Sequence, residues 1–369
     1  MKQIDFTETL RQNVPPNYKI PHRSQVYVGF GCHQKCGFCY YKSKCSDGMF
    51  EKSYVLRQID LLIAYGITDF EITGGEPSEC EDLRCYCEYI KEKNKNFKIA
   101  IITNGGLWKC NIWDLIDEVL ISYHLDKNPD NYNKNIFPLG STYKKVIKTV
   151  EKARENDIFI RTNTVIGTFN IERMDFIVND LINDIQPSII NLLPVNLFDE
   201  AEQYGMEKYI NYSNLRPILK KSIDKIRNKL KNTLVFVRFM PFCDMNGYEQ
   251  HIVGTLQHIY DFFDWNVEMC GYNLMEYLKK YKTNDEILQY LGNFGDKTYE
   301  KANDAIKNSY EKSSKCLTCK FYMICDGVER TNDHHLLSNI VPTKGKMIKN
   351  YMEYIKNTTE NVYNILYEQ

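Results

Sequence analysis

The chain has 369 residues and a mass of 43.5 kDa, with 43% hydrophobic and 26% charged residues. This supply of apolar side chains is enough for a sizeable core and excludes wholesale disorder. The 47 basic and 48 acidic residues give a formal net charge of −1, which argues against a nucleic acid as the partner. No apolar run reaches the roughly 18 residues that a membrane-spanning helix needs, so we expect no membrane partner.

The cysteine content is the compositional feature that needs an explanation. Residues 1–24 contain no apolar segment of the kind that a secretory signal peptide has, so we expect a cytoplasmic protein. In that reducing compartment, the 13 cysteines are better explained as metal ligands or reactive thiols than as disulfides. An odd number of cysteines also cannot pair completely within one chain.

Strand and helix patterns alternate over the first part of the chain. Strand patterns occur at Ser24–Phe30, Asp69–Thr73, Phe97–Thr103, Glu118–Tyr123, Ile158–Ile166 and Ser188–Val195. Helical spacing of apolar residues occurs at Lys52–Tyr65, Cys80–Lys93, Thr142–Arg154, Met174–Ile185 and Asn214–Leu230. This alternation predicts βα units and a parallel sheet, either doubly wound or curved into a partial barrel. Both architectures place functional residues at the carboxyl ends of the strands.

The pattern changes near residue 235. Leu234–Phe239 is one more strand pattern, and the segment Pro241-Phe242-Cys243 ends the alternation. We therefore divide the chain into an N-terminal extension (1–24), an α/β domain (25–235), a cysteine-containing domain (236–335) and a C-terminal helical tail (336–369).

Three cysteines, Cys32, Cys36 and Cys39, follow the first predicted strand with the spacing C-x3-C-x2-C. Three thiolates on one short loop can ligate three irons of a [4Fe–4S] cluster and leave the fourth iron open to a small molecule. The alternative is a structural zinc site, which requires a fourth ligand such as Cys45. His33 is next to Cys32 in the chain and is poorly placed to bind the same ion.

This cysteine motif, with the aromatic Phe38 directly before its third cysteine, resembles that of the radical S-adenosylmethionine (SAM) superfamily. The resemblance implies an α/β fold of the partial (β/α)6 TIM-barrel type. It also implies that the three cysteines bind a [4Fe–4S] cluster whose fourth iron binds SAM. Reductive cleavage of SAM would then release a 5′-deoxyadenosyl radical that abstracts hydrogen from a substrate.

The second predicted strand ends in Gly74-Gly75-Glu76-Pro77. Paired glycines permit a sharp turn and a close approach of the backbone to a ligand. The segment resembles the GGEP motif of the superfamily, which implies contact with the methionyl ammonium of SAM; a plain β-turn is the alternative. The same resemblance implies further SAM contacts in the cysteine loop and at strand ends, at Phe38, Asn104, Ser122, His124, Asn163 and Ile166. A capping or loop role is the alternative for the polar members of this set.

A second cysteine motif, C-x2-C-x5-C, lies at Cys316, Cys319 and Cys325. It resembles the C-terminal auxiliary-cluster domains of radical SAM enzymes, named SPASM with two clusters and twitch with one. The full SPASM pattern would have a further cysteine where this chain has Glu329, so we expect one auxiliary [4Fe–4S] cluster. Cys270 is the first choice for its fourth ligand and Cys243 the second. Three-cysteine ligation and structural zinc are the alternatives.

The segment between the two motifs offers Tyr248, Glu249 and His251 as catalytic residues facing the substrate, with a packed connector as the alternative. The resemblance implies a radical SAM enzyme, and we expect it to act on a peptide or protein side chain, with the auxiliary cluster assisting oxidation or substrate binding. A small metabolite or nucleotide-like substrate is the alternative, and a non-enzymatic iron–sulfur or zinc protein is a third hypothesis. The expected electron donor is a flavodoxin or ferredoxin.

Overall fold

The computed structural model describes residues 21–128, 132, 134–195, 210–254, 265–330 and 340–349. The contacts divide the chain into two compact units, and each is described by itself. The larger unit comprises residues 24–210 and 217–236, and the smaller one comprises residues 1–23, 211–216 and 237–369. The predicted N-terminal extension and C-terminal tail lie largely outside the described residues.

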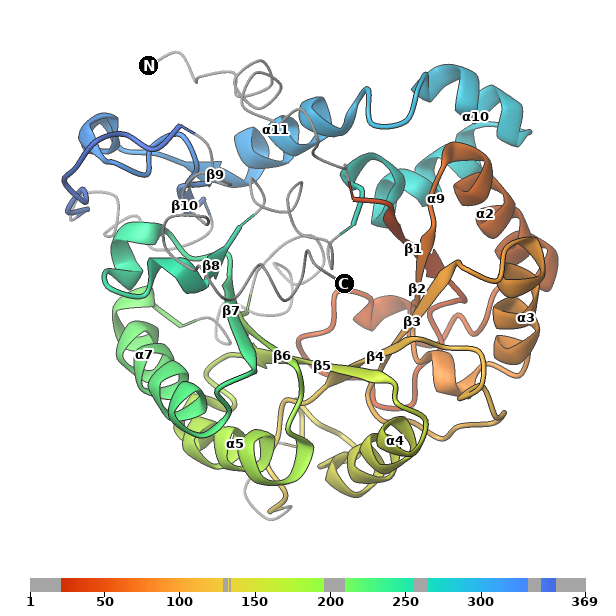
Figure 1. The fold of residues 1–369 in the computed structure, drawn as a ribbon, viewed down its shortest axis with the longest axis horizontal. Helices are drawn as coiled ribbons and strands as arrows, with labels where there is room; N and C mark the ends of the chain where they lie inside the picture. Colours follow the sequence, from red (N-terminus) through yellow and green to blue (C-terminus); the bar gives the residue numbers. More distant parts are fainter. Residues whose placement is uncertain are drawn as a thin grey trace. The chain divides into compact units, whose positions relative to one another are not determined.

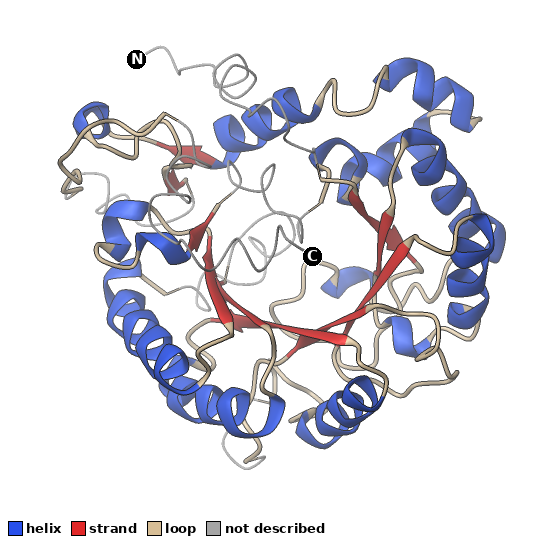
Figure 2. Ribbon diagram, in the orientation of Figure 1, coloured by secondary structure: helices blue, strands red, loops and turns tan. Residues whose placement is uncertain are grey.

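Strands and helices alternate in the larger unit, as the sequence predicts. The strands are β1 (Arg23–Tyr27), β2 (Asp69–Thr73), β3 (Lys98–Thr103), β4 (Glu118–Ser122), β5 (Phe159–Ile166), β6 (Ile189–Pro194) and β7 (Leu234–Arg238). The helices are α2 (Lys52–Tyr65), α3 (Leu83–Lys93), α4 (Tyr143–Glu155), α5 (Met174–Asp180) and α7 (Tyr212–Lys229). Helices α2 to α5 cover the outer side of the strands (Figure 1, Figure 2).

The order of the strands decides between the two architectures that the sequence left open. In the described part of the chain the main sheet has eight strands in the order β1-β2-β3-β4-β5-β6-β7-β8, where β8 is Ile252–Val253. The pairs β2–β3, β3–β4, β4–β5, β5–β6 and β7–β8 are parallel. A doubly wound sheet reverses its strand order at a switch point, whereas this sheet follows the chain in one direction. The prediction of a partial TIM-type barrel is therefore confirmed, and β7 and β8 extend its sheet.

Burial on both faces explains the apolar strands of the larger unit. All five residues of β1 are buried, as are four of the five in β4. Continuous burial of this kind is expected for a parallel sheet whose outer face is covered by helices. Arg161 of β5 is nevertheless fully buried, because its guanidinium pairs with Glu118 of β4 and, at 2.9 Å, with Glu71 of β2. A buried charge is tolerated only with such partners.

Two predicted elements differ from the observed ones for local reasons. The first strand ends at Tyr27 rather than Phe30, because Gly29 has a φ of 144° and forms a bridge to Met49 instead. The predicted helix over Met174–Ile185 is α-helical only to Asp180 and then continues as one π-helical turn.

The smaller unit contains helices α9 (Gly271–Lys280), α10 (Asn284–Leu291) and α11 (Thr298–Ser309). A short antiparallel pair of strands, β9 (Tyr310–Glu311) and β10 (Val328–Glu329), encloses the second cysteine motif. Helix α10 begins with a capping box, in which Thr283 and Glu286 each accept a backbone N–H of the other. No described helix of either unit is long and apolar enough to cross a membrane.

Candidate functional site

The first cysteine motif lies on a loop that the backbone closes at its base. The N–H groups of Phe30 and Gly31 both donate to the carbonyl of Gly48 at 2.9 Å, and the N–H of Cys32 donates to that of Cys45 at 3.4 Å. All three motif cysteines have partly buried side chains. The loop therefore collects three thiols directly after β1, on one short and closed segment.

The Gly74-Gly75 pair packs against the backbone of this loop. The N–H of Gly75 donates to Gly29 at 2.8 Å, and the N–H of Glu76 donates to Gly31 at 2.9 Å. A Cβ at Gly75 would lie 2.0 Å from the carbonyl oxygen of Gly31, and one at Gly74 would lie 2.2 Å from that of Gly29. The glycines are thus required by the approach of two backbone segments, which locks the motif at the end of β2 onto the cysteine loop.

Glu76 is buried and accepts three hydrogen bonds. Its Oε1 accepts from the hydroxyl of Thr103 at 2.6 Å and from the N–H of Ser78 at 3.1 Å, and its Oε2 accepts from the N–H of Asn104 at 2.7 Å. Burial raises the pKa of this carboxyl group, and the three donors oppose that shift by stabilising the carboxylate. Glu76 therefore joins the end of β2 to the end of β3.

Asn104 brings the end of β3 to the cysteine loop. Its Nδ2 lies 3.9 Å from the sulfur of Cys32 and donates a weak hydrogen bond to it, while its Oδ1 accepts from the N–H of Gly106 at 3.0 Å. A side-chain hydrogen bond between His33 and Glu79 makes a second link between the loop and the segment after β2. The predicted residues Cys32, Glu76 and Asn104 thus lie together.

The ends of β4 and β5 hold a partly buried aromatic group beside the loop. His124 accepts the N–H of Val165 on Nδ1 at 3.0 Å, so its proton is on Nε2 when the ring is neutral. Burial lowers the pKa of His124 to about 4, which keeps the ring neutral at pH 7. Phe38 packs edge-on against His124, with ring centroids 5.0 Å apart, and stacks on Phe169 at 4.8 Å. Two predicted site residues, Phe38 and His124, are therefore in contact.

The remaining predicted residues of this group lie along β4 and β5. Ser122 is opposite Asn163 in the β4–β5 register, and the Oδ1 of Asn163 accepts from Asn191 of β6 at 2.9 Å. Ile166 ends β5 and is fully buried. Pro77, also buried, begins the short 3-10 helix after Glu76. The prediction that these side chains contact SAM stays a prediction.

Burial makes the three thiols reluctant to ionise without a metal. Desolvation raises the pKa of Cys32 to about 11 and that of Cys36 to about 12. The pKa of Cys39 is raised chiefly by a hydrogen bond with Cys45, then by burial. Thiolates are the ligand form, so bound iron would supply the positive charge that these sites need. Among the described residues, no three His, Cys, Asp or Glu side chains stand close enough to hold a single metal ion.

The Radical SAM superfamily matches residues 26–181 of the chain. The chain contains a radical SAM domain. The superfamily uses a [4Fe–4S] cluster and SAM, and these are the cofactors of the domain. Three thiols on one loop are the donor set that such a cluster takes, so the residues of the loop fit the group.

Curated relatives of the radical SAM domain include enzymes with different substrates. GTP 3′,8-cyclase of Clostridium perfringens is 27% identical over 198 residues, which are 52% of this chain and 59% of that protein. The chain thus matches less than two thirds of that relative. The cysteine-type anaerobic sulfatase-maturating enzyme of Clostridium perfringens is 25% identical over 349 residues, which are 80% of this chain and 85% of that enzyme.

Two solved structures share the architecture of this chain over most of its length. Streptococcus suis SuiB bound to the precursor peptide SuiA matches with a TM-score of 0.56 at 18% identity, covering 89% of this chain and 75% of that one. Native anSMEcpe with bound AdoMet matches with a TM-score of 0.53 at 17% identity, covering 93% and 98%. At these identities the likeness shows the fold.

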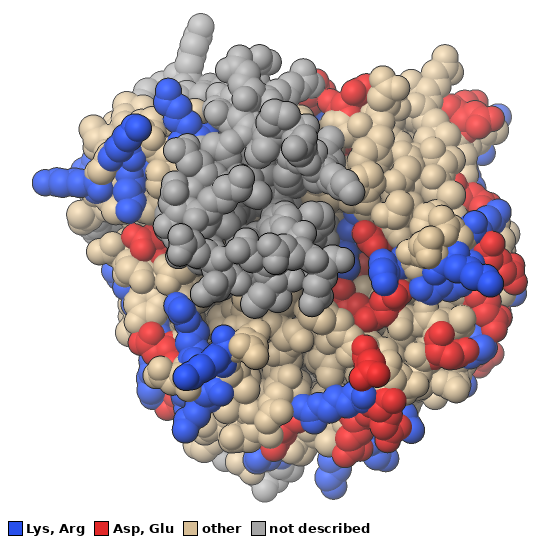
Figure 3. All heavy atoms as spheres, viewed as in Figure 1, with Lys and Arg blue, Asp and Glu red and all other residues tan. Residues whose placement is uncertain are grey.

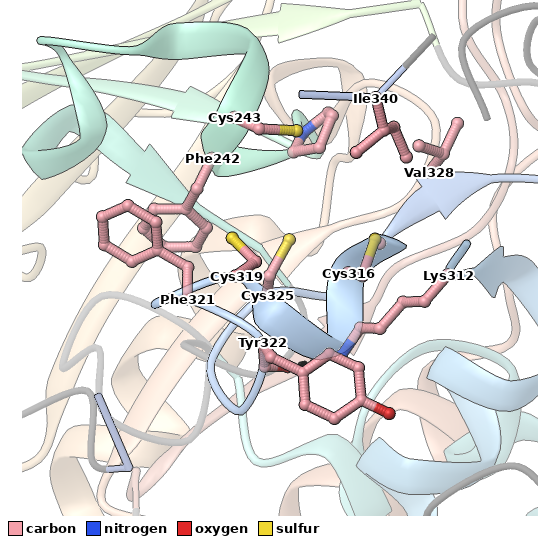
Figure 4. Close-up of a pocket in the computed structure, with 12 residues that line it drawn as sticks. Phe242, Cys243, Lys312, Cys316, Cys319, Phe321, Tyr322, Cys325, Val328 and Ile340 are labelled. Atoms are coloured by element: carbon pink, nitrogen blue, oxygen red, sulfur yellow. Dashed lines mark hydrogen bonds between the residues drawn. The ribbon is translucent and has the colours of Figure 1, made fainter. Parts of the chain in front are cut away.

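Outside the radical SAM domain, the second cysteine motif lines a cavity in the smaller unit. Figure 4 shows the sulfur atoms of Cys316, Cys319, Cys325 and Cys243 turned into the same space. Cys243 comes from a 3-10 helix (Phe242–Met245) that follows β7. The rings of Phe242 and Phe321 stack at 4.7 Å beside these thiols and also line the cavity.

Burial also governs this second group of thiols. It raises the pKa of Cys325 to about 11, and it raises those of Cys243 and Cys316 as well. Cys325, Cys316 and Cys319 all contribute to the shift at Cys243, which shows that the four sulfurs share one electrostatic environment. Burial lowers the pKa of Lys312, which lines the same cavity.

Cys270, the first choice for a fourth ligand, does not line this cavity. It precedes helix α9, and its sulfur lies 3.7 Å from the carbonyl oxygen of Val267. The sequence offered little reason to prefer Cys243, because 72 residues separate it from Cys316. The one local signal was its place directly after a strand.

The three predicted catalytic residues lie just before β8. Glu249 and His251 are buried in a 3-10 helix, and the Oε2 of Glu249 accepts the N–H of Gly247 at 2.9 Å. The rings of Tyr248 and His251 are 6.4 Å apart. The carboxylate of Glu249 thus stabilises its own turn, and a catalytic role for the three residues stays a prediction.

Proposed function

We propose that this protein is a radical SAM enzyme that modifies a peptide or protein side chain. The observation that carries the proposal is the junction of Cys32, Glu76 and Asn104. The three residues come from a loop and two strand ends that the sequence separates, and hydrogen bonds join them at the carboxyl ends of β2 and β3. That edge of the sheet is where a barrel of this type binds its ligands.

Each group at the junction has a role that its own contacts support. Cys32, Cys36 and Cys39 would hold the cluster, and Glu76 and Asn104 would keep the motif after β2 against their loop. The neutral Nε2–H of His124 and the face of Phe38 would contact SAM. When bound, the cluster and SAM supply a 5′-deoxyadenosyl radical that abstracts hydrogen from the substrate. The closed loop and the partly buried aromatic group would help to exclude water from that reaction.

The peptide substrate is supported by the extent of the similarities. The likeness to GTP 3′,8-cyclase covers 52% of this chain, whereas those to the sulfatase-maturating enzyme and to SuiB cover 80% and 89%. SuiB was solved with a precursor peptide. The GTP 3′,8-cyclase identity of 27% favours a nucleotide-like substrate as the second candidate.

The test of the enzyme is formation of 5′-deoxyadenosine after anaerobic cluster reconstitution and reduction with dithionite. Wild-type protein and a Cys110→Ala control should form it, because Cys110 lies outside both cysteine motifs. Cys36→Ala should form none above background. Absence of 5′-deoxyadenosine from wild-type protein with its full iron content would reject the proposal.

The test of the substrate class supplies a mixed peptide library and GTP in separate reactions. We expect the library to raise the rate of 5′-deoxyadenosine formation, with a change in the mass of some peptides. GTP should leave the rate of 5′-deoxyadenosine formation at the level measured without any added substrate. The reverse result would replace the peptide with a nucleotide.

We further propose an auxiliary [4Fe–4S] cluster held by Cys243, Cys316, Cys319 and Cys325. The shared cavity of these four thiols supports Cys243 over Cys270 as the fourth ligand. Cys243→Ala should lower the iron content of the auxiliary site or make the cluster labile, whereas Cys270→Ala should keep about four irons there. Iron loss from Cys270→Ala alone would restore the first choice. A flavodoxin or ferredoxin in the cytoplasm would supply electrons to both clusters.

A further inference from the structure

Lys312 precedes the second cysteine motif in the chain and reaches the segment between Cys319 and Cys325. Its side chain is partly buried and lines the cavity with the four cysteines (Figure 4). Its Nζ donates to the carbonyl of Tyr322 at 2.8 Å and lies 4.7 Å from the centre of the Tyr322 ring. The ammonium group is therefore held at one place, on the stretch of chain between Cys319 and Cys325.

Lys312 lines the same cavity as the four cysteines. Burial lowers the pKa of Lys312, and the negative charges of Cys325, Asp326, Cys316 and Cys319 oppose that shift. Placing an ammonium group in a partly buried site costs free energy unless negative charge compensates it. Four thiolates around a [4Fe–4S] core leave a net negative charge in both oxidation states, and reduction adds one more. A cation in this position would stabilise the reduced cluster most.

We propose that Lys312 is a positioning residue that raises the reduction potential of the auxiliary cluster held by Cys243, Cys316, Cys319 and Cys325. This inference rests on the auxiliary cluster of the proposed function. Outer groups of this kind, through charge and hydrogen bonds, set the potentials of iron–sulfur clusters. The carbonyl that Lys312 holds also belongs to the ligand loop, so one side chain supplies both charge and position.

The test is a redox titration followed by electron paramagnetic resonance on the full-length chain. Cys32, Cys36 and Cys39 are replaced by alanine in every sample, so the auxiliary cluster is the remaining source of the signal. Lys312→Gln removes the charge and keeps a donor, and Lys312→Arg keeps the charge. Lys315→Gln is the matched control, because Lys315 is exposed and adjacent to Cys316 in the chain.

We expect Lys312→Gln to make the cluster harder to reduce. At a fixed potential the ratio of reduced to oxidised cluster should fall at least about fivefold, a shift of about 40 mV for one electron. Lys312→Arg should change the ratio less than about twofold, because it keeps the positive charge. Lys315→Gln should also change it less than about twofold, because the charge of the exposed Lys315 is screened by water and salt. Equal shifts in Lys312→Gln and Lys315→Gln, or no shift in Lys312→Gln, would overturn the inference.

Iron content separates this inference from the proposal beneath it. If the background protein without the first motif holds no iron, the auxiliary cluster itself is refuted. If Lys312→Gln loses the cluster and Lys312→Arg retains it, the requirement for a cation is supported. If both Lys312→Gln and Lys312→Arg lose the cluster, Lys312 acts only as a structural hydrogen-bond donor, and its role in setting the reduction potential is overturned.

Discussion

The contact between the glycine pair and the cysteine loop makes a quantitative prediction for Gly75→Ala. The new Cβ would lie 2.0 Å from the carbonyl oxygen and 2.5 Å from the carbonyl carbon of Gly31, and both are backbone atoms that cannot rotate away. One segment must therefore move by about an ångström. Overpacking of this kind costs about 1–3 kcal/mol.

The same movement weakens the two hydrogen bonds that Gly75 and Glu76 donate to the loop, at about 1 kcal/mol each. The combined loss is about 3–5 kcal/mol. For a folded unit of about 200 residues, this lowers the melting temperature of the metal-free protein by roughly 10 °C. Because the loop must shift away from β2, we also expect less iron to bind after reconstitution.

The assay is a thermal melt under anaerobic, reducing conditions, with iron counted in parallel. Gly48→Ala is the control: it also places a side chain in the cysteine loop, but its Cβ meets nothing within 4 Å. Its cost is confined to its positive φ of 77°, about 1 kcal/mol. A Gly75→Ala protein that melts within 2 °C of wild type, at about 1 kcal/mol or less, would refute the argument.

Three further predictions concern stability. Arg161→Met leaves the buried carboxylates of Glu71 and Glu118 without a cationic partner and should destabilise the larger unit by about 3–5 kcal/mol. A loss below about 1 kcal/mol in a urea titration would contradict the importance of these buried ion pairs. His124 stays neutral when folded, with a pKa of about 4, but takes a proton near pH 6.5 when unfolded. The contribution of His124 to the free energy of unfolding is therefore fully present above about pH 6.5. The free energy of unfolding falls by about 3 kcal/mol as the pH drops toward 4, and His124→Gln should remove this pH dependence. Thr283→Ala removes the cap of α10 and should cost about 1 kcal/mol, measured as protection of its amides from hydrogen exchange.

The two cysteine motifs show most clearly what the sequence can predict and what it cannot. Cys32, Cys36 and Cys39 lie within eight residues, so their spacing alone places them on one loop whatever the rest of the chain does. Cys243 and Cys316 are far apart in sequence, and only the fold brings their sulfurs into one cavity. The sequence made Cys270 the first choice and Cys243 the second, and local patterns carry no information about such long-range contacts.

The roles of individual side chains divide in the same way. Sequence identified Gly74, Gly75 and Glu76 through a short motif, and the assignment of the glycines to the approach of a ligand stays a prediction. The structure shows that they admit the backbone of the cysteine loop, and that Glu76 is occupied by donors from its own turn and from β3. Lys312 carried no sequence signal, because a lysine is ordinary at any surface position.

By itself, the sequence determined the alternation of strands and helices, the loop with three thiols and the second group of cysteines, since each depends on residues close together in the chain. It left open whether the sheet is doubly wound or a barrel, because both have the same local pattern. Tertiary structure decided this through strand order, and it also brought Asn104 to Cys32 and placed Cys243 and Cys325 in one cavity. Such long-range pairings depend on the packing of whole elements, which local periodicity does not encode.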